Sequence, residues 1–353
     1  MSQLFEPVSL GRIALANRVV MAPMTRSRAE DDDCVSDLHV RYYSQRASAG
    51  LIITEGTHPS KNGKGYCRTP GIYNQQQVAA WKKVVDAVHA QGGKIVLQLM
   101  HCGRVASAEN KAADAETIAP SAIQANDKIF TNKGMLPMDM PRALTTAEVA
   151  EVIEEYRQAT VYAFEAGFDG VELHCTSGYL PAQFLSTGTN QRDDQYGGSL
   201  ENRLRFVLEA LAAIASVDGA DRVGMRICPG NPFNDLHDDD PQQTFAALLD
   251  QVDKLNLAYL HVIRLPKGPV DNLALAREHF HGPLMINDSF DAEEAGRAIE
   301  SGQAAAVSFG RDFIANPDLV RRMKEQLPLS KMNPRTLYTP GPEGLVDYPT
   351  ADE

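Results

Sequence analysis

The segment 174–179, His174-Cys175-Thr176-Ser177-Gly178-Tyr179, places an imidazole and a phenol five positions apart. It follows the apolar run 168–173, which is typical of a buried strand in a parallel sheet. In α/β barrels, the side chains just beyond the C-terminal end of a strand supply the chemistry. The pattern therefore predicts a polar site at the point where a buried strand opens to solvent.

Similar polar side chains end other apolar runs. Thr25, Gln98 and Arg226 lie at or just past the ends of three further strand candidates. With His174 and Tyr179 they bring hydrogen-bond donors from four strands toward one point. The group contains no obvious nucleophile paired with a base. It suits a flat ring rich in heteroatoms, on which Arg226 can stabilise negative charge.

Two turns indicate a phosphate site on the same rim. The last two strand candidates end in Asn287-Asp288-Ser289 and in Phe309-Gly310-Arg311. Barrels commonly bind phosphate at this position, through backbone N–H groups and a helix N-terminus. The two patterns together predict a phosphorylated planar cofactor.

Eight short apolar runs alternate with helical patterns along the chain, which implies parallel strand pairing. No GxGxxG follows the first run, so the sequence predicts an α/β fold of the (β/α)8 TIM-barrel type and not an open sheet. The expected strands are Arg18–Met21, Gly50–Thr54, Lys94–Leu99, Gly167–His174, Arg222–Ile227, Tyr259–Ile263, Leu284–Asn287 and Ala304–Phe309. The expected helices are Gln75–Gln91, Thr145–Ala166, Leu200–Ala215, Pro241–Leu255, Asp271–His279, Ala292–Glu300 and Pro317–Glu325.

We expect one barrel domain over residues 1–353. The stretch His101–Ala143 follows the third strand and is too long for an ordinary connection, so it is expected to be a functional flap or cover. A tail from about residue 328 is expected to pack over the barrel.

Composition narrows the class of protein. The net charge of -12 argues against a general affinity for nucleic acid or anionic membranes, and small-molecule partners are expected. Five cysteines without a CxxC pair predict neither a disulfide framework nor a zinc site, and they fit a cytoplasmic location. No apolar run approaches the roughly 18 to 20 residues of a membrane span, and the N-terminus does not read as a signal peptide.

The ordered motifs resemble one known family nearly end to end, the Old Yellow Enzyme family of FMN-dependent ene-reductases. The similarity is carried by Asn17 through Arg26, by Pro70-Gly71-Ile72-Tyr73, by Gln98 through Arg104, by Gly178-Tyr179-Leu180 through Asn190-Gln191-Arg192, by Asp194 through Ser199 with Glu201-Asn202-Arg203, by Phe309 through Pro317, and by Glu343-Gly344 with Asp347-Tyr348-Pro349.

The resemblance implies FMN as the cofactor and NADPH or NADH as the reductant. It implies that the flavin ring is held around the barrel mouth by Pro23, Met24, Thr25, Gly56, Gln98, His174 and Arg226. Thr25 would tune the redox potential, and Arg226 would favour the anionic reduced flavin. The phosphate would be held by Asn287, Asp288, Ser289, Gly310 and Arg311.

The resemblance also implies the catalytic roles. His174, with Ser177 three positions later, would bind the carbonyl or nitro oxygen of the substrate, and Tyr179 would protonate the α-carbon. The β-carbon would receive a hydride that originates from NAD(P)H. Tyr66, Met100 and Tyr338 would line the substrate pocket. The expected partners are small activated alkenes or nitro compounds, and the expected state is a monomer or homodimer.

Three features depart from the family pattern, at four positions. Ser177 stands where Asn or His is usual, so we expect a looser clamp on the substrate oxygen. Met100 replaces a usual Trp, which predicts a wider and more adaptable pocket wall. Asp288-Ser289 replaces Gly-Gly in the phosphate turn, which predicts weaker FMN binding.

Other interpretations stay open. A flavin-binding barrel with nitro or nitrate-ester reductase activity, or with little alkene activity because of Ser177, is one alternative. A metal-dependent barrel hydrolase with His101-Cys102 and His174-Cys175 as ligands is another, although no HxH follows the first strand and Arg226 opposes a cation. Glu172 is interpreted as a member of a structural ion pair, and the run Asp238-Asp239-Asp240 as a solvated loop.

Overall fold

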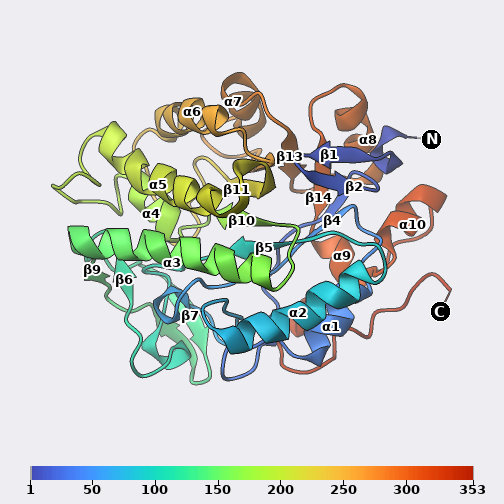
Figure 1. The fold of residues 1–353 in the computed structure, drawn as a ribbon, viewed down its shortest axis with the longest axis horizontal. Helices are drawn as coiled ribbons and strands as arrows, with labels where there is room; N and C mark the ends of the chain where they lie inside the picture. The colour runs from blue at the N-terminus through green and yellow to red at the C-terminus, as the bar shows by residue number, and fades with distance from the viewer. Residues whose placement is uncertain (1, 353) are drawn as a thin grey trace.

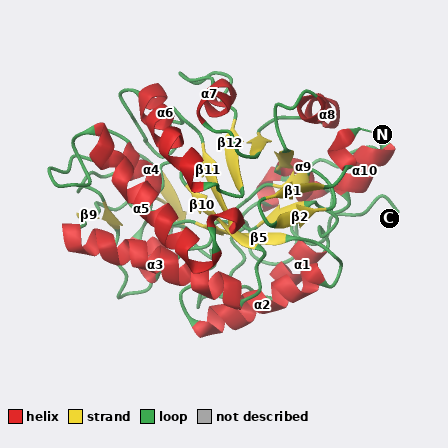
Figure 2. Cartoon of the chain, turned by 45° about the horizontal axis from the view of Figure 1, so that its top comes forward, coloured by secondary structure: helices red, strands yellow, loops and turns green. Residues whose placement is uncertain are grey.

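In the computed structural model, which describes residues 2–352, eight parallel strands close into a barrel in the order β10-β11-β12-β13-β14-β3-β4-β5 (Figures 1 and 2). All eight strands of the sequence prediction are confirmed, each within a few residues. Their bounds are β3 Val19–Met21, β4 Leu51–Ile53, β5 Ile95–Leu99, β10 Gly170–His174, β11 Val223–Ile227, β12 Tyr259–Ile263, β13 Leu284–Asn287 and β14 Ala306–Phe309.

Helices surround these strands, as Figure 2 shows. The predicted helices are confirmed, with bounds α2 Gln75–His89, α3 Thr146–Glu165, α5 Leu200–Asp218, α6 Pro241–Val252, α7 Asn272–His279, α8 Ala292–Glu300 and α10 Leu319–Glu325. The start of α3 is fixed by a capping box, in which Thr145 and Glu148 each accept a backbone hydrogen bond from the other. The prediction missed α1 Asp37–Ser44, α4 Leu180–Leu185 and α9 Arg311–Ala315, and short 3₁₀ helices lie at Gln3–Phe5, Lys61–Gly63, Ala108–Asn110, Ala220–Arg222, Asp253–Leu255 and Pro334–Thr336.

The strands divide their side chains between two cores. Residues that alternate along each strand, such as Val171 and Leu173 of β10, pack outward in the large cluster shared with the helices. The interleaved residues face the interior of the barrel. Near the N-terminal ends of the strands these inner residues are apolar, and near the C-terminal ends they are polar: Gln98, Glu172, His174, Arg226, His261 and Ser308.

An N-terminal hairpin closes the apolar end of the barrel. Strands β1 Val8–Leu10 and β2 Ile13–Leu15 pair antiparallel, and Leu10, Ile13 and Leu15 join the inner apolar cluster. Gly11 in the turn has φ +55, and a Cβ there would lie 2.1 Å from the backbone oxygen of Asp221. Only glycine fits this close approach without strain.

The stretch His101–Ala143 contains short strands and is less irregular than expected. Strands β7 Lys128–Thr131 and β8 Gly134–Pro137 form an antiparallel hairpin, and β6 Ile118–Ala119 pairs in parallel with β9 Arg142–Ala143. Ile129 and Met138 pack in a cluster with Tyr179. The stretch therefore contacts the predicted site directly, and its role as a flap stays a prediction.

The C-terminal segment is held by buried arginines that follow β3. Arg28 donates to the backbone oxygens of Thr336, Leu337, Gly341 and Glu343, at 2.5 to 3.3 Å. Arg26 donates to the oxygen of Gly344 at 2.6 Å. These bonds attach the predicted tail to the rim next to Thr25. No helix within residues 2–352 is long and apolar enough to cross a membrane.

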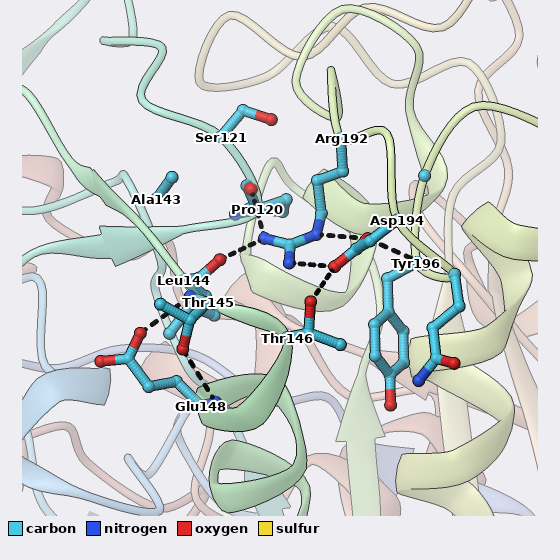
Figure 3. A network of polar contacts seen from close by, with 12 residues as sticks. Pro120, Ser121, Ala143, Leu144, Thr145, Thr146, Glu148, Arg192, Asp194 and Tyr196 are labelled. Carbon is cyan, nitrogen blue, oxygen red and sulfur yellow. Dashed lines mark hydrogen bonds and ion pairs between the residues drawn. The ribbon is translucent and has the colours of Figure 1, made fainter.

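Arg192 joins the base of the flap to the segment that follows α4 (Figure 3). Its guanidinium donates to the backbone oxygens of Pro120 and Leu144, and it pairs with Asp194. Asp194 accepts a further hydrogen bond from the Thr146 hydroxyl at 2.6 Å. The side chain of Arg192 is buried, so this network holds the chain next to the paired strands β6 and β9 against the segment that follows α4.

We predict that Arg192→Lys loosens the flap, because an ammonium group cannot reach two carbonyls and a carboxylate in the fork geometry of a guanidinium. The free energy of unfolding should fall by about 2 kcal/mol, with faster amide hydrogen exchange in residues 118–144. The control is Arg157→Lys, which changes an exposed ion pair with Glu154. Unchanged exchange in the flap would contradict this role of Arg192.

Candidate active site

The register of β5, β10 and β11 brings the predicted site residues together. Glu172 lies beside Gln98, and His174 lies beside Arg226, as paired positions of adjacent strands. All four side chains are buried. The register therefore brings three members of the predicted ring, Gln98, His174 and Arg226, into one region beside Glu172, and it says nothing of the fourth, Thr25.

Arg226 is buried with only part of its hydrogen-bonding capacity used. Its Nη2 donates to Oδ1 of Asn287 at 2.8 Å, and the amide of Asn287 donates to the backbone oxygen of Ser308 at 2.9 Å. Nη1 is buried and has no partner in the described chain. A buried guanidinium nitrogen of this kind calls for an acceptor, so Arg226 fits an electron-rich ring edge.

Glu172 is held by a chain of buried hydrogen bonds. Gln98 donates its Nε2 to Glu172 Oε1 at 2.8 Å, and His261 Nδ1 lies 2.9 Å from Glu172 Oε2. His261 Nε2 lies 2.7 Å from the hydroxyl of Ser308. The predicted ion pair is instead a hydrogen bond to a histidine whose pKa is lowered to about 4, and the carboxylate also orients Gln98.

The pKa values fix the protonation states in this network. Burial alone would raise the pKa of Glu172, but His261, Arg226 and Gln98 outweigh it and lower the pKa, so the carboxylate is ionised. Burial and Arg226 lower the pKa of His261 to about 4, which makes it neutral. His261 Nδ1 therefore carries the proton given to Glu172, and Ser308 donates to Nε2. The Nε2 of Gln98 is directed to Glu172, which leaves its Oε1 free to accept.

His174 and Tyr179 lie together, with ring centroids 5.0 Å apart. Burial and then Arg226 lower the pKa of His174 to about 3, so the imidazole is neutral and has one N–H that can donate a hydrogen bond. Its buried Nδ1 has no partner in the described chain. The hydroxyl of Tyr179 donates to that of Tyr66 at 3.1 Å, and burial raises its pKa well above the usual value. Tyr179 thus stays protonated at neutral pH.

A strained turn connects these two residues. Ser177 has φ +59 and Gly178 has φ +76, after which Tyr179 forms the N-terminal boundary of α4. Asn234, from the loop after β11, donates to the backbone oxygen of Ser177 at 2.7 Å. Sequence reasoning missed Asn234, because its role depends on a contact 57 positions away. The role of the Ser177 hydroxyl toward substrate stays a prediction.

A cavity of about 650 Å³ opens beside Tyr179. Four predicted residues line it, namely Thr25, Tyr66, Tyr179 and Tyr338, together with Ile129 and Met138 of the flap. Exposed apolar side chains stand around its entrance: Phe130, Met135, Phe233 and Tyr338. The volume and the mixed lining suit an organic molecule with one polar group.

Two glycines of the predicted cofactor site, Gly56 and Gly310, have methionine side chains close by. A Cβ on Gly56 would lie 2.4 Å from the sulfur of Met100, and a Cβ on Gly310 would lie 3.4 Å from that of Met24. Gly56 is buried, and a larger residue there would displace Met100. Met100 packs with Tyr66 and Tyr179 but does not itself line the cavity, so its place on the pocket wall stays a prediction.

The predicted phosphate turn has an unusual backbone. Asp288 has φ +87 and Ser289 has φ +57, the conformation for which glycine is the usual residue. Strands β13 and β14 are neighbours, so this turn lies near Gly310 and Arg311. Arg311 is exposed, and no ion pair of the described residues includes it. The side chain of Asn287 is bonded to Arg226, so only the backbone of Asn287 can contribute to the predicted phosphate site.

These residues fit FMN on observations of this chain. Two buried nitrogens without partners, Arg226 Nη1 and His174 Nδ1, stand at the barrel mouth, and the Oε1 of Gln98 is free to accept a hydrogen bond. Within residues 2–352, no group of three or more His, Cys, Asp and Glu side chains is placed to hold a metal ion. His101 and His174 thus do not form the ligand set that a hydrolase would need.

The acidic run after β11 is more ordered than a solvated loop. Asp238 accepts from the backbone N–H of Thr187 at 3.1 Å, and Asp240 caps α6 by accepting from Gln243 at 2.9 Å. The run therefore attaches the loop after β11 to the segment that follows α4.

Asp33 anchors the loop that carries Tyr66. It is buried, and it accepts from Tyr73 at 2.9 Å and contacts His58 at 3.1 Å and Lys64. Burial alone would raise the pKa of Asp33, but His58 and Lys64 outweigh it and lower the pKa to about 2. Sequence reasoning missed this cluster, whose members are scattered through residues 33–73.

A barrel whose mouth combines a free guanidinium nitrogen, an oriented glutamine and an imidazole–phenol pair defines a flavin-dependent oxidoreductase site. The family model described as "NADH:flavin oxidoreductase / NADH oxidase family" matches residues 3–330. The chain belongs to this family, that of Old Yellow Enzyme, and binds FMN.

Individual relatives agree over nearly the whole chain. It is 42% identical over 355 residues to a probable flavin mononucleotide-dependent alkene reductase of Leishmania infantum, covering 98% of this chain and 97% of the relative. It is 41% identical to 12-oxophytodienoate reductase 7 of Oryza sativa subsp. japonica, covering 98% and 94%.

Solved structures agree as well. Morphinone reductase in complex with tetrahydroNAD has a TM-score of 0.95 at 44% identity, covering 100% of this chain and 98% of that chain. An old yellow enzyme homologue from Zymomonas mobilis has a TM-score of 0.94 at 38% identity, covering 98% and 99%.

We predict that Asp33→Asn reduces stability at neutral pH and less so in acid. The carboxylate has a lowered pKa in the folded state, so its contribution is complete above the unfolded value near 3.8 and is lost as the pH falls through about 2. The difference in free energy of unfolding between wild type and variant should be about 2 kcal/mol at pH 6 and should shrink below pH 4. Asp114→Asn, at an exposed pair with Lys61, is the control. A difference independent of pH would contradict the assignment.

Proposed function

We propose that this protein reduces the C=C bond of activated alkenes, using NADPH or NADH through FMN. The main support is the pairing of His174 and Tyr179, 5.0 Å apart, over the buried Arg226 and Gln98. Relatives named as alkene reductase and 12-oxophytodienoate reductase support the same class of substrate.

The proposed flavin site divides the work among the rim residues. Backbone near Pro23, Met24 and Gly56, with Thr25 and Gln98, would hold the ring, and Arg226 would stabilise negative charge on it. The turn Asn287, Asp288 and Ser289, with Gly310 and Arg311, would hold the phosphate. When bound, FMN takes a hydride from NAD(P)H and supplies one to the substrate.

The substrate would be polarised by His174. A hydrogen bond from the neutral imidazole to a carbonyl or nitro oxygen withdraws electron density and makes the β-carbon electrophilic. Ser177 would add a second, weaker donor.

Tyr179 would give the α-carbon its proton. A general acid must be protonated before the step, and burial keeps the phenol protonated. The hydrogen bond to Tyr66 holds the Tyr179 oxygen in place, and the hydroxyl would rotate from Tyr66 to the substrate for proton transfer. The flap and Tyr338 would exclude water from the cavity, so that the proton comes from the phenol. Nitro compounds are proposed as further substrates, and a monomer or homodimer as the state in solution.

The two half-reactions can be separated anaerobically. The purified protein should be yellow, should be bleached by NADPH, and should regain colour with cyclohexenone. We expect Tyr179→Phe to leave the bleaching rate within about twofold and to slow recolouring by roughly 100-fold, since general acids contribute about that factor or more. Folded protein that does not bind flavin would contradict the proposal. Equal recolouring rates in the wild type and Tyr179→Phe would contradict the role of Tyr179.

Ser177→Asn tests the clamp on the substrate oxygen. An amide reaches farther than a hydroxyl and offers two donor hydrogens. A phenolate ligand should bind to the variant about tenfold more tightly, the equivalent of one good hydrogen bond to a charged group. The dissociation constant is read from the long-wavelength absorbance of the flavin–phenolate complex. Equal constants, with unchanged FMN affinity in both proteins, would show that Ser177 does not face the ligand.

A further inference from the structure

The phosphate turn after β13 is held in a conformation that its residues do not favour. Asp288 and Ser289 both have positive φ, at +87 and +57. Each such residue costs of order 1–2 kcal/mol when it is not glycine. A neighbouring group must therefore hold the turn in place.

That group is Arg264, the residue directly after β12. Its Nε donates to the backbone oxygen of Asp288 and its Nη2 to that of Ser289, both at 2.7 Å. Its backbone N–H donates to the oxygen of Asn287 at 3.0 Å. Three consecutive carbonyls of the turn are thus bound by one residue.

The guanidinium of Arg264 is itself fixed on two further sides. Glu294 of α8 accepts from Nη1 at 2.7 Å and from Nη2 at 3.1 Å. The carbon Cζ lies 3.8 Å from the ring centroid of Phe290. Glu294 neutralises the charge of Arg264, and the guanidinium lies over the ring of Phe290. Arg264 therefore acts by holding backbone groups in position more than by attracting the phosphate electrostatically.

The direction of the carbonyls determines the direction of the N–H groups. In a trans peptide the N–H of each residue points opposite to the preceding carbonyl, and the described chain contains no cis bond. The N–H groups of Ser289 and Phe290 therefore point away from Arg264. No hydrogen bond of residues 2–352 uses either of them as a donor. Successive free N–H groups of this kind bind anions.

We propose that Arg264 is a positioning residue for the phosphate of FMN. Arg264 binds the carbonyls of Asp288 and Ser289, which turns the N–H groups of Ser289 and Phe290 toward the phosphate. Glycines would adopt this turn without such support, so Arg264 compensates for their absence. The inference rests on the proposed placement of the phosphate at this turn.

The test compares FMN with riboflavin, which lacks the phosphate. Flavin is removed from the purified protein, and each ligand is titrated by quenching of its fluorescence. Arg264→Gln should bind FMN about tenfold more weakly, a loss equivalent to roughly one charge-assisted hydrogen bond, while riboflavin affinity stays within twofold. Arg297→Gln is the matched control, because Arg297 lies on α8 and forms an exposed ion pair with Glu293.

The results distinguish a role of Arg264 in phosphate binding from a role in stabilising the fold. An equal loss for FMN and riboflavin would mean that Arg264 only stabilises the fold, and no loss for either would also overturn the proposal. Wild-type protein that binds neither flavin would refute the proposed function itself. Wild type that binds FMN while Arg264→Gln loses nothing would refute only the inference.

Glycine substitution gives a second readout. In an Asp288→Gly/Ser289→Gly background the turn no longer needs to be held against strain, so adding Arg264→Gln should weaken FMN binding by less than threefold. The same tenfold loss in both backgrounds would contradict an action of Arg264 on the turn backbone.

Discussion

A guanidinium buried in the barrel mouth is the constraint on which the site depends. Removing Arg226 from water is costly unless its nitrogens find partners. Asn287 satisfies one nitrogen, the ionised Glu172 lies in the same polar layer, and Nη1 is left without a partner. An electron-rich ligand can accept the hydrogen bond that Nη1 still has to donate. We therefore expect the free-energy cost of burying Arg226 to be offset when the flavin binds.

The barrel makes this arrangement possible by separating its tasks. Outward residues of each strand pack against the helices, and the lower interior is closed by the N-terminal hairpin. Stability comes from these layers, which leaves the upper interior free to hold polar groups. There, Glu172 accepts hydrogen bonds from Gln98 and His261, so the amide of Gln98, which we propose contacts the flavin, is oriented in advance.

The strands could be predicted from the sequence, because each is a short apolar run with a polar residue at its end. The helices that open with a capping residue could be predicted as well. The sequence was insufficient for α4 and α9, which are too short to show a helical period, and for the hairpin of the flap. Gln98, His174 and Arg226 were found from their positions. His261 and Ser308 were missed, although each is a polar residue at an inward position of an apolar strand, and that signal could have revealed them. Arg264 and Asn234 act on backbone groups of distant segments, which no local pattern reports.

A crystal structure of the protein with FMN and a phenolic ligand tests the account most directly. We predict that the flavin ring lies at the barrel mouth with its polar edge within hydrogen-bonding distance of Gln98 Oε1 and Arg226 Nη1, and that the phenolic oxygen meets His174 beside Tyr179. A flavin bound elsewhere, or a ring that leaves Arg226 Nη1 without a partner, would contradict it.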